Sequence, residues 1–429
     1  METGGIDAAT STDGARGEVG AAPLTGLRVL SVEQAVAAPL CTQHLVDLGA
    51  EVIKVERPGS GDFARAYDSA VAGESAWFYW LNRGKRSLAI DIKHPRADGV
   101  LSRLLNRADV FVQNLAPGAV ERLGLGVPAL RSSYPRLIIC NISGYGPDGP
   151  YRDRKAYDAL LQGETGVIAL TGSEREAARA GISVGDIATG MYSLSSILAA
   201  LYRRRADGQG CAIEVSLFDS LSQWVSPAMY GFLATGRQPG RAGTRHSSIL
   251  PYGLFRTADG SQVNLAVQNE REWDRFCRIV LQSPELADDV RFAGNERRLE
   301  RRSEIEPLIE GILAGLTHAE LVSRLEAADV PWGEYRDVAG LATHPQLIER
   351  QRLLPAVREG LPPVMAHPMN LEGLEQRARA VPAVGEDTRT VLAEVGYGAT
   401  EVEALLAAGV VQAAGQVSME QRGTGGWIL

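Results

Sequence analysis

Features that would direct the protein to a membrane, an oxidising compartment or a metal are missing from the sequence. No run of 18 apolar residues could span a bilayer, and the N-terminus has neither the basic start nor the apolar stretch of a signal peptide. The four cysteines form no CxxC pair, and the six histidines form neither an HxxxH pair nor a cluster with cysteine. We therefore expect a cytoplasmic protein with reduced thiols, no membrane partner and no bound metal.

An excess of basic charge is also missing. Lys and Arg number 44 against 52 Asp and Glu, which gives a formal net charge of −8. This balance argues against a broad surface for nucleic acid or anionic lipid, so an anionic ligand would need a local basic cluster. At 429 residues the chain is longer than one hydrophobic core usually grows. Two domains, or one large domain with an insertion, are expected.

The first half of the chain has the pattern of an α/β fold. Residues 1–23 are rich in Gly, Ala, Ser and Thr without apolar periodicity, which predicts a disordered tail. After them, short β-branched runs alternate with helical patterns, which predicts right-handed βαβ units and a mainly parallel sheet. The expected strands span 28–32, 51–56, 87–92, 109–114, 136–143 and 211–218, and a long apolar helix spans 191–205.

The second half has a different pattern. A stretch rich in Gly, Pro and Arg predicts a linker after about residue 235. The segment YGLFRTADGSQVNLAV (252–267) predicts a β-hairpin turning at Asp259 and Gly260, and amphipathic helices follow to about Asp329. We expect a large domain over 24–230, a linker over 231–250, a small α+β domain over 251–330, and a linker and return to the large domain over 331–429.

One glycine-rich motif is misleading. GYGPDG (144–149) follows a predicted strand and fits the spelling of a dinucleotide-binding loop. Pro147 removes an amide that would face a phosphate, and the charged residues after Pro150 do not open an apolar helix. A simple Gly/Pro turn is the better interpretation.

Basic residues concentrate near the ends of the early strands, where open α/β sheets bind ligands. They are Lys54, Arg57, Arg65, Arg83, Lys85, Arg86 and Lys93. Such a cluster could bind a ligand with several phosphates, but a solvated charged face has the same pattern. Two carboxylates, Asp158 and Asp186, lie at predicted loop-to-helix junctions, where an Asp is either an ordinary N-cap or an anion held near helix amides.

Seven blocks of sequence, spread over residues 24–410, carry the strongest functional signal. They are GLRVLSVEQAVAAPLCTQHLVDLGAEVIKVERPGSGD (26–62), LNRGKRSLAIDIKHP (81–95), NLAPGAVERLG (114–124), KAYDALLQGETG (155–166), VGDIATGMYSLSSILAAL (184–201), HSSILPYGLF (246–255) and VGEDTRTVLAEVGY (384–397). Together and in this order, they resemble the class III CoA-transferases of the CaiB/BaiF type. That family includes formyl-CoA transferase, carnitine CoA-transferase and the methylacyl-CoA racemases.

The resemblance implies a fold, a cofactor and a mechanism. The fold would be a Rossmann-like large domain and a small domain joined by long linkers, in a homodimer of interlocked rings. Coenzyme A would be a co-substrate, with no tightly bound cofactor. Asp186 would be the nucleophile that forms an aspartyl-CoA thioester, Asp158 would orient either Asp186 or the acyl group, and amides near Gly185 and in the 246–253 loop would stabilise oxyanions. The implied CoA contacts are Val36, Ala37, Arg57, Ile90, Lys93, Asn114, Arg122, Lys155 and Tyr157.

Departures from the family pattern bear on the substrate. The formate and oxalate members carry a glycine-rich run where this chain has HSSILPYG, which argues against formyl-CoA or oxalate. The racemases place a His before the second-block Asp, where this chain has Tyr157, so the proton-transfer pair of a racemase is incomplete. Racemase and non-catalytic CoA-binding protein stay open as alternatives.

The acids are expected to be small, with C4 or C5 dicarboxylates such as succinate, mesaconate, itaconate or citramalate favoured. Arg245, His246 and Tyr252 form the expected substrate loop, although Arg245 and His246 could equally face only solvent or the linker.

Overall fold

The computed structural model describes residues 22–415, so the predicted tail lies almost wholly outside the described residues. The described chain falls into two compact units, one made of residues 22–141, 193–213 and 354–415 and the other of 142–192 and 214–353. These units group the chain differently from the predicted domains. Residues 142–192 and 214–230 are grouped with the predicted small-domain residues, and the two segments contact each other where helix α6 (Asp158–Glu164) packs against helix α9 (Leu217–Thr235).

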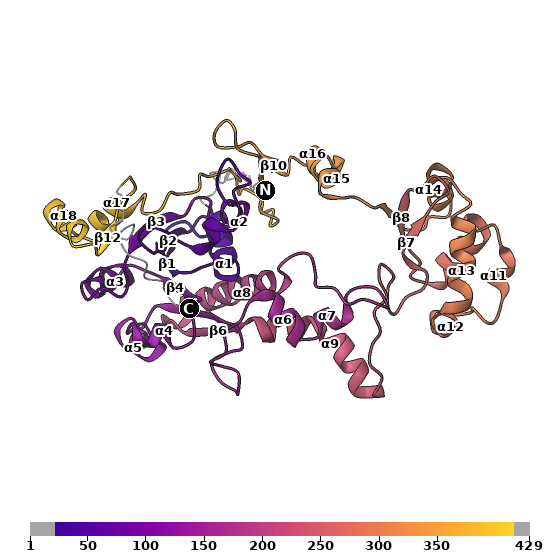
Figure 1. Cartoon of the computed structure of the whole chain (residues 1–429), viewed down its shortest axis with the longest axis horizontal. Helices are drawn as coiled ribbons and strands as arrows, with labels where there is room; N and C mark the ends of the chain where they lie inside the picture. Colours follow the sequence, from indigo (N-terminus) through magenta and orange to yellow (C-terminus); the bar gives the residue numbers. More distant parts are fainter. Residues whose placement is uncertain (1–21, 416–429) are drawn as a thin grey trace, which may run out of the picture. The chain divides into compact units, whose positions relative to one another are not determined.

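A seven-stranded sheet forms the centre of the first unit (Figure 1). Its order is β12-β3-β2-β1-β4-β5-β6, and the pairs among β1 to β5 are all parallel. The strands are β1 (Arg28–Val32), β2 (Glu51–Glu56), β3 (Arg86–Ile90), β4 (Val110–Gln113), β5 (Ile138–Ser143), β6 (Ala212–Ser216) and β12 (Val411–Gln412). The prediction of a mainly parallel α/β sheet is confirmed, and each of the first six strands lies where its sequence run predicted it.

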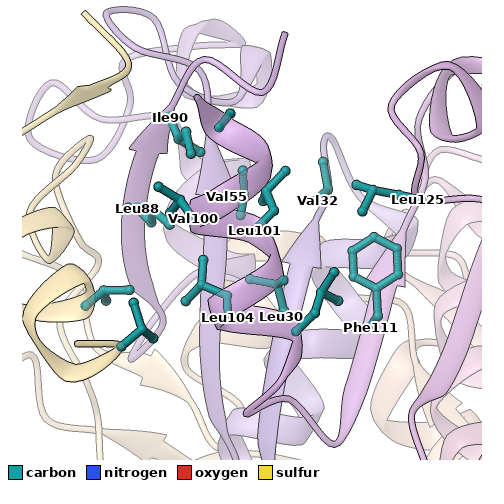
Figure 2. Close-up of a cluster of buried hydrophobic side chains, with 14 of the residues drawn as sticks. Leu30, Val32, Val55, Leu88, Ile90, Val100, Leu101, Leu104, Phe111 and Leu125 are labelled. Atoms are coloured by element: carbon teal, nitrogen blue, oxygen red, sulfur yellow. The ribbon is translucent and has the colours of Figure 1, made fainter. Parts of the chain in front are cut away.

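The C-terminal segment adds a strand to this sheet, which the sequence analysis did not predict. Strand β12 pairs antiparallel with β3, through Val411 opposite Ile90. Helices α17 (Thr388–Glu394) and α18 (Ala399–Ala407) contribute Val391, Leu392 and Leu405 to the same buried cluster as helix α3 (Ala97–Leu105). Figure 2 shows this cluster, in which Val100, Leu101 and Leu104 of α3 face Leu30, Val55 and Leu88 of the sheet. The remaining helices of this unit are α1 (Ala37–Asp47), the 3-10 helix Phe63–Ala66, α2 (Ala76–Leu81), α4 (Ala119–Arg122) and α5 (Val127–Ser133).

The second unit contains the predicted hairpin. Strands β7 (Tyr252–Arg256) and β8 (Gln262–Ala266) pair antiparallel and enclose the Asp259–Gly260 turn, and β9 (Trp332–Glu334) pairs with β8. The helices around them are α10 (Glu270–Arg275), a π-helical turn (Phe276–Val280), α11 (Pro284–Asp288), α12 (Asn295–Glu300), α13 (Arg302–Leu313) and α14 (His318–Ala327). They enclose a separate apolar core that includes Phe255, Trp273 and Phe292. Shorter elements follow: α15 (Val338–Ala342), α16 (Pro345–Glu349), β10 (Leu353–Leu354) and β11 (Val364–Met365).

Two helix boundaries correct the sequence predictions. Helix α9 continues to Thr235, where Gly236 ends it in the left-handed conformation with φ of 68°, so the linker predicted over 231–250 begins five residues too early. Helix α8 (Val184–Asp207) begins seven residues before the predicted start at Met191, because Val184, Gly185 and Asp186 already form its first turn. In the described chain, α8 is also the one helix long and apolar enough to cross a membrane, a property shared by core helices of soluble proteins.

Candidate functional site

The strand order indicates that a ligand would bind at the carboxyl ends of β1 and β4. Neighbouring strands run β3-β2-β1 to one side of this point and β4-β5 to the other, and α/β sheets of this order bind ligands where the order reverses. Asn114, which follows β4, bridges the two loops: its Nδ2 donates to the Gln34 carbonyl, and its Oδ1 accepts from the Gln34 amide, both at 2.8 Å. Asn114 therefore holds the β1–α1 loop in place, and its predicted contact with CoA stays a prediction.

The β1–α1 loop leads into predicted CoA-binding residues. Ala35 has a φ of 62°, unusual for a residue with a Cβ, and its amide donates to Asp62 Oδ1 at 3.1 Å. Val36 and Ala37 follow at the N-terminus of α1, both buried. Helix N-termini carry amides without helical partners, which suit phosphate or other anionic groups. This backbone can therefore accept part of an anionic ligand.

A network of buried ion pairs holds the β1–α1 loop from the interior of the protein. Glu33, on the first residue after β1, lies 2.7 Å from Lys85 Nζ and 3.4 Å from Lys54 Nζ, and Lys54 also pairs with Asp62 at 2.8 Å. All four side chains are essentially buried. Burial alone would raise the pKa of Glu33, but the two ammonium groups lower it, whereas burial lowers the pKa of Lys85 to about 8. The loop is therefore fixed by charges that face inward.

This network corrects the interpretation of the basic cluster as one phosphate-binding surface. Lys54 and Lys85 are neutralised by Glu33 and Asp62, and Arg65 forms hydrogen bonds with both oxygens of Glu56. Arg86 pairs with Glu51 and Glu394 at the opposite, amino end of β3. Arg83 donates to backbone carbonyls of α2. Most of these basic side chains are therefore already paired with acidic residues that come from other strands and loops.

The other predicted CoA contacts lie in varied environments. Arg57 directly follows β2 and is half-buried, Ile90 is the buried last residue of β3, and Lys93 is exposed three residues later. These three positions share the carboxyl edge of the parallel strands with Asn114 and the β1–α1 loop. Arg122 is exposed at the end of α4. Lys155 and Tyr157, both exposed, precede α6 in the second unit. CoA binding by these residues stays a prediction.

The two predicted catalytic carboxylates do meet in the second unit. Asp158 is the first residue of α6, and its Oδ1 accepts from the Gly185 amide at 2.7 Å and the Asp186 amide at 3.4 Å. Asp158 thus caps the first turn of α8 from a neighbouring helix. Gly185 is needed for close approach, because a Cβ there would lie 3.0 Å from both Asp158 Oδ1 and Leu221 Cδ1. It is not a tight-turn glycine, since it lies within the helix.

The environment of Asp186 is that of a reactive carboxyl group. Burial, and then the negative charge of Asp158, raise the pKa of Asp186 to about 7. Its position in the first turn of α8 places it beside helix amides that stabilise anions. A carboxylate poised near neutrality next to a second, hydrogen-bonded carboxylate is a typical arrangement of a catalytic site. The Gly185 amide itself donates to Asp158, so the oxyanion role expected of amides near Gly185 stays a prediction for the neighbouring amides.

The predicted substrate loop is engaged in internal contacts. Arg245 Nε lies 2.9 Å from Glu306 and its Nη2 lies 2.5 Å from Glu310, and its guanidinium stacks on Phe255. Both glutamates come from α13, so sequence proximity did not reveal them. His246 stacks on Tyr252 with ring centroids 5.0 Å apart. With its charge balanced by two carboxylates, Arg245 is a poor partner for the second carboxylate of a substrate.

A cluster that sequence reasoning missed lies at the C-terminal end of α1. His44, Asp47 and His367 place one potential metal-ligand atom each within 4.8 Å of one another. The Met369 amide donates to His367 Nδ1 at 3.1 Å, so the neutral ring carries its proton on Nε2 and that nitrogen is a donor. This tautomer suits a hydrogen-bonding cluster better than a metal site. Only the His44 and Asp47 spacing on one helix face was visible in the sequence.

The described chain thus combines a mainly parallel α/β sheet with two neighbouring carboxylates, Asp158 and Asp186, at the first turn of α8. The family model described as CoA-transferase family III matches residues 24–388. Human succinyl-CoA:glutarate CoA-transferase is 34% identical over 408 residues, covering 91% of this chain and 90% of that protein. Succinate–glutarate CoA-transferase of Agrobacterium fabrum is 35% identical over 392 residues, covering 87% and 96%.

The same relationship holds for solved structures. The crystal structure of a CAIB/BAIF family protein from Brucella suis has a TM-score of 0.76 and 32% sequence identity, and the match covers 88% of this chain and 100% of that chain. The chain therefore belongs to CoA-transferase family III. It is an enzyme of the class III CoA-transferase type, with coenzyme A as co-substrate.

Proposed function

We propose that this enzyme transfers CoA between small dicarboxylic acids through an aspartyl-CoA thioester on Asp186. The observation that carries the mechanism is the pairing of Asp186 with Asp158 at the first turn of α8. The substrate class rests on the relatives, since the human and Agrobacterium proteins are named for succinate and glutarate. It does not rest on Arg245, which is already paired.

The proposed chemistry conserves the energy of the thioester. The Asp186 carboxylate attacks the thioester carbonyl of the donor, and the C–S bond breaks, so that CoA leaves as a thiolate and a mixed anhydride between Asp186 and the donor acyl group remains. The thiolate then attacks the Asp186 carbonyl and expels the donor as a free carboxylate. An acceptor carboxylate then attacks the aspartyl-CoA thioester and releases CoA as a thiolate, which leaves a second mixed anhydride. The thiolate attacks the acceptor's carbonyl in this anhydride, so that the new acyl-CoA forms and the Asp186 carboxylate is regenerated. Each intermediate hydrolyses in water, so the site must exclude it during transfer.

The substrate class predicts a specific activity profile. With succinyl-CoA as donor, C4 and C5 dicarboxylates are expected to be acceptors at least about tenfold better in kcat/KM than monocarboxylic acids of equal length, because a second carboxylate can add a charge-assisted hydrogen bond. Acyl-CoA products separated by liquid chromatography provide the measurement. Oxalate and formate are the negative controls, because the HSSILPYG segment argues against both as substrates. A monocarboxylic acid as the best acceptor would reject the dicarboxylate assignment but leave the transfer mechanism standing.

We also propose a homodimer whose subunits are interlocked. Helix α9 exposes five large apolar side chains that an isolated chain would leave in water: Trp224, Met229, Tyr230, Phe232 and Leu233. The chain between Thr235 and Tyr252 has no helix or strand, which suits a segment passing around a second copy. A second copy is therefore the proposed cover of the α9 face.

Interlocked subunits are expected to resist separation by dilution. Light scattering and sedimentation should give twice the 46.0 kDa chain mass down to nanomolar concentration, because linked rings cannot part without unfolding. Leu233→Asp should reduce the yield of folded dimer by burying a charge at the interface. Val290→Asp, at a residue that is 71% exposed on another segment, is the matched control and should have little effect. A folded wild-type monomer appearing on dilution would contradict the interlock.

A further inference from the structure

A fully buried glutamine lies behind the carboxylate pair. Gln162, in the second turn of α6, has 0% exposure. Its Nε2 donates to Asp158 Oδ2 at 2.7 Å and more weakly to the Ile182 carbonyl at 3.4 Å, and its Oε1 accepts from the Ala180 amide at 2.9 Å. One side-chain amide therefore ties α6 to the segment that leads into α8.

These contacts continue through Asp158 to the reacting residue. Asp158 Oδ2 faces Gln162, while Oδ1 accepts from the amides of Gly185 and Asp186. Both oxygens of the carboxylate are thus held, so the Asp158 side chain has one orientation. That orientation determines where the negative charge lies relative to the Asp186 carboxyl group, and charge interactions at such short range are strong in a buried site.

We propose that Gln162 is a positioning residue of the active site, which acts by holding the Asp158 carboxylate against the first turn of α8. This inference rests on the proposed role of Asp186 as nucleophile. Gln162 touches no substrate, because it is fully buried and its polar atoms all have protein partners. Its effect on catalysis passes through the charge and geometry of Asp158.

A purely structural role gives a different expectation. A buried glutamine that only satisfies backbone groups would change stability when replaced, but it would leave the pH profile of the surviving activity unchanged. A positioning role makes the ionisation of Asp186 depend on the hydrogen bond from Gln162 to Asp158, so the neutral change Gln162→Leu should move the pH profile and lower kcat, while Gln162→Glu adds the direct effect of a charge. The pH profile therefore separates the two roles.

Gln162→Glu tests the proposal directly. The introduced carboxylate can still accept from the Ala180 amide, but it opposes Asp158 Oδ2 where a donor stood. The acidic limb of the kcat/KM profile should move up by about one pH unit, and kcat should fall at least about tenfold, while the KM for acyl-CoA stays within about threefold. The shift arises because an added negative charge favours the protonated form of Asp186.

An exchange of the two groups provides the rescue. In the double variant Asp158→Asn with Gln162→Glu, the introduced amide donates to the introduced carboxylate, and its oxygen can still accept from Gly185. The hydrogen bond between positions 158 and 162 is restored, but the negative charge now lies at position 162, further from Asp186. The double variant should recover at least about tenfold in kcat over Gln162→Glu alone, and its acidic limb should lie below that of the wild type.

The matched control uses the same side-chain pair elsewhere in the chain. Gln43 is also buried and donates to an aspartate one helical turn away, Asp47, at 3.0 Å. Gln43→Glu should lower stability without moving the pH profile. An unchanged profile in the neutral variant Gln162→Leu, or a double variant no more active than Gln162→Glu, would overturn the proposal. Absence of a trapped Asp186 adduct in the wild type would instead reject the proposed function itself.

Discussion

Asp186→Asn is expected to abolish CoA transfer, with a loss of about ten-thousand-fold or more in kcat, while the protein still folds and binds CoA. The substitution removes the oxygen that attacks the thioester but preserves the size of the side chain. Asp186 lies in the first turn of α8 and is not its N-cap, so the change costs no capping bond. If Asp186 served only structure, Asn would leave activity nearly intact.

The covalent intermediate gives the decisive measurement. Wild-type enzyme incubated with acyl-CoA donor alone and then with hydroxylamine should carry a hydroxamate on Asp186, which peptide mass spectrometry can locate. The Asn variant should carry none. Asp219→Asn, at another first-turn aspartate of the same unit, is the control and should be labelled at Asp186 like the wild type. Full transfer by Asp186→Asn, or a hydroxamate on a different carboxylate, would reject the mechanism.

The same residue predicts a pH dependence with a defined sign. Only the ionised carboxylate attacks, and burial together with Asp158 raises the pKa of Asp186 to about 7, so kcat/KM should rise about tenfold per pH unit below pH 7 and level off above it. Because this folded-state pKa lies above the unfolded value near 4, the folded protein binds more protons between pH 4 and 7 and loses stability as pH rises through that window. Asp186→Asn removes this penalty. It should therefore be more stable than the wild type at pH 8, by about 2 to 4 kcal/mol, and equal to it at pH 4.

Glu33→Gln is expected to cost about 3 to 5 kcal/mol of the free energy of unfolding, the largest effect on stability that we predict. Glu33 is the shared partner of two buried ammonium groups, those of Lys54 and Lys85. Its replacement by an amide of the same shape leaves Lys85 with no carboxylate partner in the cluster. Because Glu33 also accepts from Thr42 at 2.7 Å at the base of α1, the β1–α1 loop should lose its position and CoA binding should weaken.

The sign of the pH effect checks this interpretation. Burial already lowers the pKa of Lys85 to about 8, and loss of Glu33 lowers it further, so the unfolded state binds the extra proton. The deficit of Glu33→Gln should therefore be larger at pH 6 than at pH 9. Denaturation at a fixed protein concentration measures it, and adding Lys85→Met should recover part of the loss. Glu51→Gln, the same change at a one-third-exposed ion pair, should cost less than about 1 kcal/mol; an equal cost at both sites would contradict the argument.

Local patterns in the sequence predicted those features that depend on neighbouring residues. Runs of β-branched residues identified the strands from β1 to β6, because period and propensity act over four to eight residues. The Asp259–Gly260 turn identified the hairpin for the same reason. Asp158 and Asp186 were found because each lies in the first turn of a helix within a block of characteristic spelling. Helix ends were less accurate, as α8 and α9 show, because caps and packing partners decide them.

The sequence by itself determined the parallel α/β order, the hairpin of the second unit and the two carboxylates of the site. The tertiary structure alone decided which charged side chains are free to bind a ligand and which are paired within the protein. Lys54 and Lys85 turn inward to Glu33, and Arg245 is neutralised by glutamates 61 and 65 residues away. It also joined Gln162 to Asp158 and Asp158 to the amide of Gly185. Such pairings depend on the distance between elements that are remote in sequence. The free energy of a charged group depends on its burial and its partner, and local sequence periodicity predicts neither of these.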